Sequence, residues 1–134
     1  MNDNVTRAAP PRRILLVEDD HFLRKAAQAS LKRHGYHVTT ACDGEEALRL
    51  VRTEKPDLIL LDLIMPKVQG FEVLRTLKAD AGTAAIPVIV LSNLGQDHDR
   101  DATLAAGAIA HMVKANISLE ELVAAVDRAL GRSL

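Results

Sequence analysis

The chain alternates short runs of apolar residues with longer stretches in which apolar residues recur every three or four positions. Residues 14–17, 58–61 and 86–91 are apolar without alternation, which predicts strands buried on both faces of a sheet. Residues 36–41 are β-branched but half polar, as expected of an edge strand, and residues 109–113 predict a short fifth strand.

The stretches between these strands carry helix signals. Asp20, Asp43 and Ser118 stand where N-caps are expected, and Asp43 and Ser118 are followed three positions later by Glu, the order of a capping box. Together with the 3.6-residue periodicity, these signals predict helices over residues 21–34, from 44 to just before Pro56, 70–79, 96–106, and from 119 to about 130.

The alternation of strands and helices, without any hairpin signal, determines the predicted fold. Such a pattern implies right-handed crossovers and a parallel sheet covered on both faces. Placing the half-polar strand on an edge beside residues 14–17 gives the strand order 2-1-3-4-5. The predicted fold is therefore of the α/β class, a single flavodoxin-like, doubly wound domain with a five-stranded parallel sheet and five helices. We expect residues 1–12, with Pro10 and Pro11, to form a flexible tail and residues 13–134 to form one domain.

Composition narrows the classes of function. Lys and Arg number 17 against 18 for Asp and Glu, and 2% of residues are aromatic, so we expect neither general attraction to nucleic acid nor a base-stacking surface. Cys42 is the only cysteine, which excludes an intrachain disulfide, and we expect it to be a small buried residue. No segment resembles a secretory signal or a membrane span of about 20 apolar residues, so the sequence predicts a cytoplasmic protein with no membrane partner.

Polar residues follow four of the predicted strands. Glu18 and Asp19 come after the first strand, Asp62 after the third, and Ser92 and Lys114 after the fourth and fifth. Because the carboxyl ends of parallel strands lie along one edge, we expect these side chains to converge where the first and third strands meet.

Three carboxylates at one place need a compensating charge. An all-oxygen ligand set favours a hard cation such as Mg²⁺, and Lys114 supplies one more positive charge. With repulsion offset, Asp62 can act as a nucleophile that forms an aspartyl phosphate, while Ser92 can hydrogen-bond a phosphoryl oxygen.

These residues resemble a known family. The acidic pair in Leu16-Val17-Glu18-Asp19-Asp20, the segment Asp62-Leu63-Ile64-Met65-Pro66, Ser92 and Lys114 occur in the order found in receiver domains of bacterial two-component response regulators. The resemblance covers residues 13–131.

The resemblance implies that Asp62 accepts a phosphoryl group from a histidine kinase or a histidine phosphotransfer protein. It implies that Asp19 and Asp62 ligate Mg²⁺, with Glu18 acting directly or through water and the backbone carbonyl of Ile64 completing the protein ligands. Ser92 and Lys114 would then relay the change to a surface formed by the fourth helix, fifth strand and fifth helix. That surface would bind a downstream protein, and the chain would be a monomer or a phosphorylation-dependent dimer.

Several positions depart from the family pattern. Ala115 replaces the usual proline after the lysine, and because a non-proline cis bond costs about 2.5–4 kcal/mol we predict a trans peptide. Asn93 either lines the phosphoryl site or narrows its entrance, and His111 replaces the switch aromatic, either as packing or as a titratable group. Ile64 and Leu94 cannot orient an attacking water, which predicts slow self-dephosphorylation. Beyond self-phosphorylation from a phosphodonor and this slow self-dephosphorylation, the resemblance implies no enzymatic activity.

Three alternatives compete with a stand-alone receiver domain. A Mg²⁺-dependent phosphohydrolase with an aspartate nucleophile needs a second acid at position 64, where this chain has isoleucine, and a cap domain. A nucleotide-binding fold of the flavodoxin type lacks its Gly-rich loop after the first strand. The chain could also be the receiver part of a longer regulator: Met1 with its polar tail suggests a natural start, whereas Leu134 suits either a natural end or a truncation before an output domain.

Overall fold

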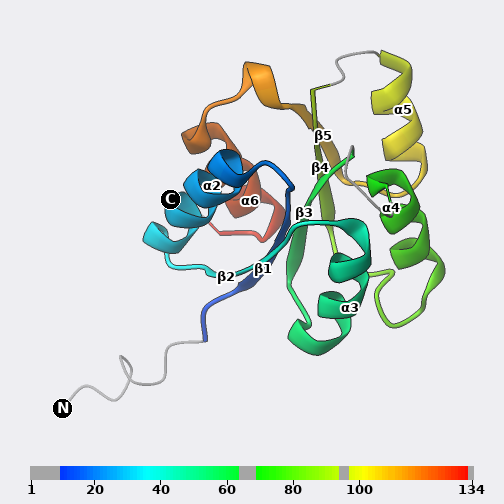
Figure 1. The fold of residues 1–134 in the computed structure, drawn as a ribbon, viewed down its shortest axis with the longest axis horizontal. Coiled ribbons are helices and arrows are strands. Elements are labelled where there is room, and N and C mark those ends of the chain that lie inside the picture. Colours follow the sequence, from blue (N-terminus) through cyan, green and yellow to red (C-terminus); the bar gives the residue numbers. More distant parts are fainter. Residues whose placement is uncertain (1–9, 64–68, 94–96, 133–134) are drawn as a thin grey trace.

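The structure is a computed structural model that describes residues 10–63, 69–93 and 97–132. Five parallel strands form one sheet in the order β2-β1-β3-β4-β5, with helices on both faces (Figure 1). The strands are β1 (Arg13–Val17), β2 (His37–Ala41), β3 (Leu58–Asp62), β4 (Val88–Ser92) and β5 (Ala110–Val113). The predicted flavodoxin-like fold and strand order are confirmed.

Two helical layers bury the sheet from opposite sides. The helices are α2 (His21–Arg33), α3 (Gly44–Glu54), α4 (Gly70–Ala79), α5 (Asp97–Ala105) and α6 (Leu119–Ala129). In Figure 1, α2 and α6 lie on one side of the strands and α3, α4 and α5 on the other. Alternate residues of the strands point to each layer, so that Leu16 and Leu60 pack toward α2 and α6, whereas Leu15 and Leu61 pack toward α3 and α4. Burial on both faces explains why these strands lack a polar alternation.

The predicted caps determine where the helices begin. The Asp20 carboxylate accepts the Leu23 N–H, and Ser118 and Glu121 form both bonds of a capping box. Asp43 accepts the Glu46 N–H, and the Glu46 carboxylate accepts the backbone N–H of Cys42. Cys42 is exposed in this turn, so the prediction that it is buried is wrong.

Strand β4 differs from its predicted span in a way that affects the site. It begins after Pro87, which has no N–H for the ladder, and it includes Ser92 as its last residue. The register pairs Asp62 with Leu91 and Ser92 with Val113, so the ends of β3, β4 and β5 lie at one level. The sheet therefore presents Asp62 beside the residues that end its neighbours.

Most of the predicted tail, residues 1–9, lies outside the described residues. Where the described chain begins, the guanidinium of Arg12 donates to the carbonyl of Leu130, 3.2 Å away, at the end of α6. In the described part of the chain, every helix is too short or too polar to span a bilayer.

Candidate functional site

Acidic side chains from two neighbouring strands meet at the carboxyl edge of the sheet. One carboxylate oxygen each from Glu18, Asp19 and Asp62 lies within 4.8 Å of the others. Glu18 and Asp62 are 1% and 4% exposed, whereas Asp19 is exposed to solvent. These three side chains line one cleft together with Asn93 and Lys114. The structure thus brings together the residues that the sequence predicted at the junction of the first and third strands.

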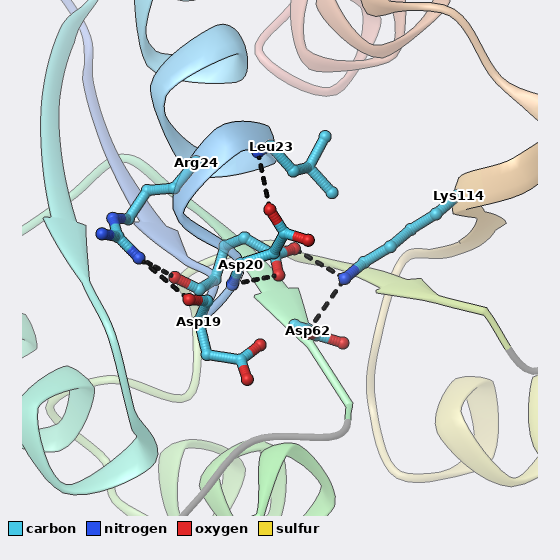
Figure 2. Close-up of polar contacts among 7 residues, drawn as sticks. Asp19, Asp20, Leu23, Arg24, Asp62 and Lys114 are labelled. Carbon is cyan, nitrogen blue, oxygen red and sulfur yellow. Dashed lines mark hydrogen bonds and ion pairs between the residues drawn. The ribbon is translucent and has the colours of Figure 1, made fainter.

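Lys114 connects the two buried carboxylates. Its Nζ lies 2.7 Å from Oε1 of Glu18 and 3.0 Å from Oδ2 of Asp62, and Figure 2 shows the side chain reaching across the cleft from the end of β5. Lys114 opens a short 3₁₀ turn (Lys114–Asn116), and the peptide to Ala115 is trans, as predicted. One ammonium therefore neutralises at most one of the three carboxylates.

The Glu18 carboxylate is held at both oxygens. Its Oε1 faces Lys114, and its Oε2 accepts the backbone N–H of Asp20 at 3.1 Å. The pKa of Glu18 is raised to about 7. Burial is the main cause and the charge of Asp62 adds to it, while the bonds from Lys114 and Asp20 partly offset the increase. Burial also disfavours the charged Lys114, but its bonds to Glu18 and Asp62 outweigh this and raise the lysine pKa.

The donor set fits a divalent cation. Three carboxylates against one ammonium leave excess negative charge in a partly buried cleft, and all the candidate ligands are oxygens. Mg²⁺ and Mn²⁺ both accept such oxygen ligands and keep waters where the protein leaves positions open. Asp19, the most exposed of the three, lies where a partly hydrated cation can reach it.

If this cluster binds Mg²⁺ with help from Glu18, directly or through water, the affinity should increase with pH, because the ionised form of Glu18 attracts the cation and the protonated form does not. With a pKa of about 7, Glu18 is mostly protonated near pH 6 and mostly ionised near pH 8, so affinity measured by titration calorimetry should rise about tenfold across that interval. A Glu18→Gln variant should bind more weakly and show little change with pH. An equally steep dependence in that variant would assign the titration to another group.

The other predicted site residues lie at different depths. Ser92 is fully buried at the end of β4, and Asn93 rather than Ser92 lines the cleft. His111 is half-buried in β5. The predicted backbone ligand Ile64 lies outside the described residues, as does Leu94.

Two features of the site were missed by the sequence analysis. The guanidinium of Arg24 in α2 contacts the backbone of the acidic pair, and Gly70 at the start of α4 packs against the backbone of Asp62. Arg24 looks like any polar residue on an exposed helical turn, and Gly70 looks like an ordinary loop breaker. Only the packing of α2 and α4 on the sheet gives these residues their positions.

Comparison with known proteins identifies the family. The model of the response regulator receiver domain matches residues 14–127, and the chain belongs to this family. Members of this family act in two-component signalling, where they interact with histidine kinases and downstream targets. The cleft at the carboxyl edge therefore lies in a receiver domain.

Individual relatives agree with this assignment. A gliding motility regulatory protein from Myxococcus xanthus is 44% identical over 121 residues, which make up 90% of this chain and 16% of that protein. The chain spans about half the length of the transcriptional regulators that it also matches.

Solved structures extend the likeness to the fold. The chemotaxis protein CheY4 of Vibrio cholerae has a TM-score of 0.82 at 28% identity, covering 88% of this chain and 98% of that one. The Mn²⁺-bound form of the response regulator Rcp1 has a TM-score of 0.80 at 28% identity, covering 92% and 97%.

Proposed function

We propose that this receiver domain accepts a phosphoryl group on Asp62 from a histidine kinase or a histidine phosphotransfer protein, at a site completed by Mg²⁺, in the cytoplasm. The observation that carries the proposal is the Lys114 ammonium, bound to Glu18 and to Asp62 at the rim where Asp19 adds a third carboxylate. The Mn²⁺-bound neighbour supports a divalent cation in such a fold.

The residues divide the chemistry among them. An oxygen of Asp62 attacks phosphorus, a P–O bond forms, and the bond to the donor nitrogen or oxygen breaks with its electron pair leaving on the donor. Lys114 and the hydroxyl of Ser92 would stabilise charge on the phosphoryl oxygens. Asp19, Asp62 and Glu18 would hold the cation, which neutralises charge on the transferring group.

The proposed output is a protein-binding surface formed by α5, β5 and α6. Ser92 pairs with Val113, the residue before Lys114, so the two proposed phosphoryl contacts lie on adjacent strands. β5 continues into the 3₁₀ turn that leads to α6, and a change at Lys114 would reach both elements. Ile109, just before β5, and Leu104 on α5 are 50% and 36% exposed, which gives this side of the domain apolar area for a partner.

Incubation with acetyl phosphate and Mg²⁺, followed by intact mass measurement, tests the proposal. The wild-type chain should gain one phosphoryl group. Asp62→Asn should gain none because it lacks the nucleophile, and wild type in EDTA should gain none because the cation is removed. An adduct that persists in Asp62→Asn would overturn the assignment of the acceptor.

The same experiment separates the rival function and tests the expected lifetime. Multiple turnover of small phosphoesters without a stable adduct would instead indicate the phosphohydrolase. Because Ile64 and Leu94 cannot orient a water, the adduct should decay slowly once the donor is removed, and decay within the mixing time would contradict this expectation.

A further inference from the structure

The guanidinium of Arg24 lies against the backbone of the acidic pair. Its Nη1 donates to the carbonyl of Glu18 at 2.9 Å and to the carbonyl of Asp19 at 3.2 Å, and Figure 2 shows both bonds on the opposite side of the cluster from Lys114. Its Nη2 lies 3.3 Å from Nδ1 of His21, which must accept because a guanidinium only donates. Three contacts thus determine where the Arg24 head group lies.

These two carbonyls belong to the peptide groups on either side of the Asp19 Cα atom. Holding both peptide groups restricts φ and ψ of Asp19, and therefore the direction of its Cα–Cβ bond. Asp19 is exposed, so burial does not orient its side chain as it does for Glu18 and Asp62. The backbone contact from Arg24 supplies the orientation that packing does not.

The loop around Asp19 needs such a contact because the sheet ends just before it. The last ladder bond of β1 toward β2 is from the Glu18 N–H to the Ala41 carbonyl, 3.0 Å. Beyond this bond, the carbonyls of Glu18 and Asp19 face α2, where Arg24 donates to both. Because these bonds go to backbone carbonyls, they leave the Asp19 carboxylate open to a cation.

We propose that Arg24 is a positioning residue for the metal site: its guanidinium fixes the two peptide groups that flank Asp19 and so points the Asp19 carboxylate toward a cation shared with Asp62. The inference rests on the proposed function, since it presupposes a metal at Asp19 and Asp62. Arg24 does not touch the cation or the phosphoryl group. Its role is to organise a ligand in advance, which lowers the cost of binding.

Titration calorimetry with Mg²⁺ tests this role. Arg24→Gln should weaken Mg²⁺ binding about tenfold, the low end of the range for residues that orient metal ligands. Lys25→Gln removes one positive charge from the next residue of α2, which is exposed, and should change the affinity less than twofold. Arg24→Lys keeps the charge but loses the planar guanidinium, whose Nη1 reaches both carbonyls while Nη2 contacts His21, so it should resemble Arg24→Gln. Wild-type affinity in Arg24→Lys would show that only the charge matters and would overturn the positioning role.

Phosphorylation from acetyl phosphate distinguishes positioning from a general loss of structure. If Arg24 acts through the metal site, saturating Mg²⁺ should restore the rate of Arg24→Gln to within about twofold of wild type, with only the Mg²⁺ concentration for half-maximal rate increased. Unchanged Mg²⁺ affinity in Arg24→Gln, or a rate that stays low at saturating Mg²⁺, would overturn the proposal. If wild type itself shows no saturable Mg²⁺ binding, the metal site of the proposed function fails instead.

Discussion

Replacing Lys114 with methionine should destabilise the metal-free domain by about 2–3 kcal/mol near pH 8. Lys114 is the cation that contacts both Glu18 and Asp62, whose side chains are buried. Without it, two buried carboxylates repel each other across the cleft, and the unpaired charge carries most of the cost. The lysine side chain is 13% exposed, so solvent screens part of its interaction with the carboxylates. The expected destabilisation is therefore smaller than for a fully buried ion pair.

The sign of the pH dependence follows from the charges. The raised pKa of Lys114 means that its contribution is present throughout the acidic and neutral range and is lost only as pH rises through the lysine pKa. Its partners must be ionised to benefit from it, and the pKa of Glu18 is about 7 in the folded protein. The difference between Lys114→Met and wild type should therefore shrink as the pH falls from about 8 through the Glu18 pKa to about 6.

Urea unfolding in EDTA, at about pH 8 and about pH 6, measures the difference in the free energy of unfolding between Lys114→Met and wild type. The exposed Lys25→Met serves as the control for loss of a lysine and should lie within about 0.5 kcal/mol of wild type. Adding Mg²⁺ should recover much of the loss in Lys114→Met because a cation again faces the carboxylates. Equal stability of Lys114→Met and wild type near pH 8 would contradict the ion-pair account.

A Gly70→Ala substitution should destabilise the domain by about 3 kcal/mol and impair phosphorylation of Asp62. A Cβ atom at position 70 would lie 2.1 Å from the carbonyl oxygen of Asp62 and 2.6 Å from Cα of Leu63. Both are backbone atoms, so relief requires α4 to move away or the end of β3 to shift. The Gly70 N–H also donates to the carbonyl of Leu63 at 2.9 Å, which ties the two backbones together.

The direction of this effect is informative. Glycine inside a helix is ordinarily less favourable than alanine by up to about 1 kcal/mol, so an isolated helix would gain from the change. Gly82→Ala is a matched control, because a Cβ there meets only Oδ1 of Asp80 at 3.5 Å. Urea unfolding should show a large loss for Gly70→Ala and a change within about 1 kcal/mol for Gly82→Ala. A Gly70→Ala domain as stable as wild type would show that α4 does not constrain Asp62.

The convergence of Glu18, Asp19, Asp62 and Lys114 could be predicted from the sequence because burial determines it. Runs such as Leu58–Leu61 have no polar face and must lie inside a sheet covered on both sides. Once the strands are parallel, the residues that end them share one edge, whatever the details of the loops. The caps could be predicted for a different reason, because Asp20 and Ser118 act locally, within one helical turn.

Features that depend on contacts between elements could not be predicted. The contact between Lys114 and Glu18 depends on how far β5 extends, and the contact between Arg24 and the acidic pair depends on how α2 turns away from β1. The close approach at Gly70 depends on the packing of α4 against the end of β3. Hydrophobic periodicity assigns faces to these elements but not their separation.

Chemical trapping of the acceptor tests the central claim most directly. Borohydride reduces an aspartyl phosphate to homoserine with loss of the phosphoryl group, and peptide mass spectrometry then locates the converted residue. After treatment with acetyl phosphate and Mg²⁺, homoserine should appear at position 62, and at no other aspartate of the chain. Conversion at Asp19, or a phosphorylated chain with Asp62 unconverted, would contradict the account.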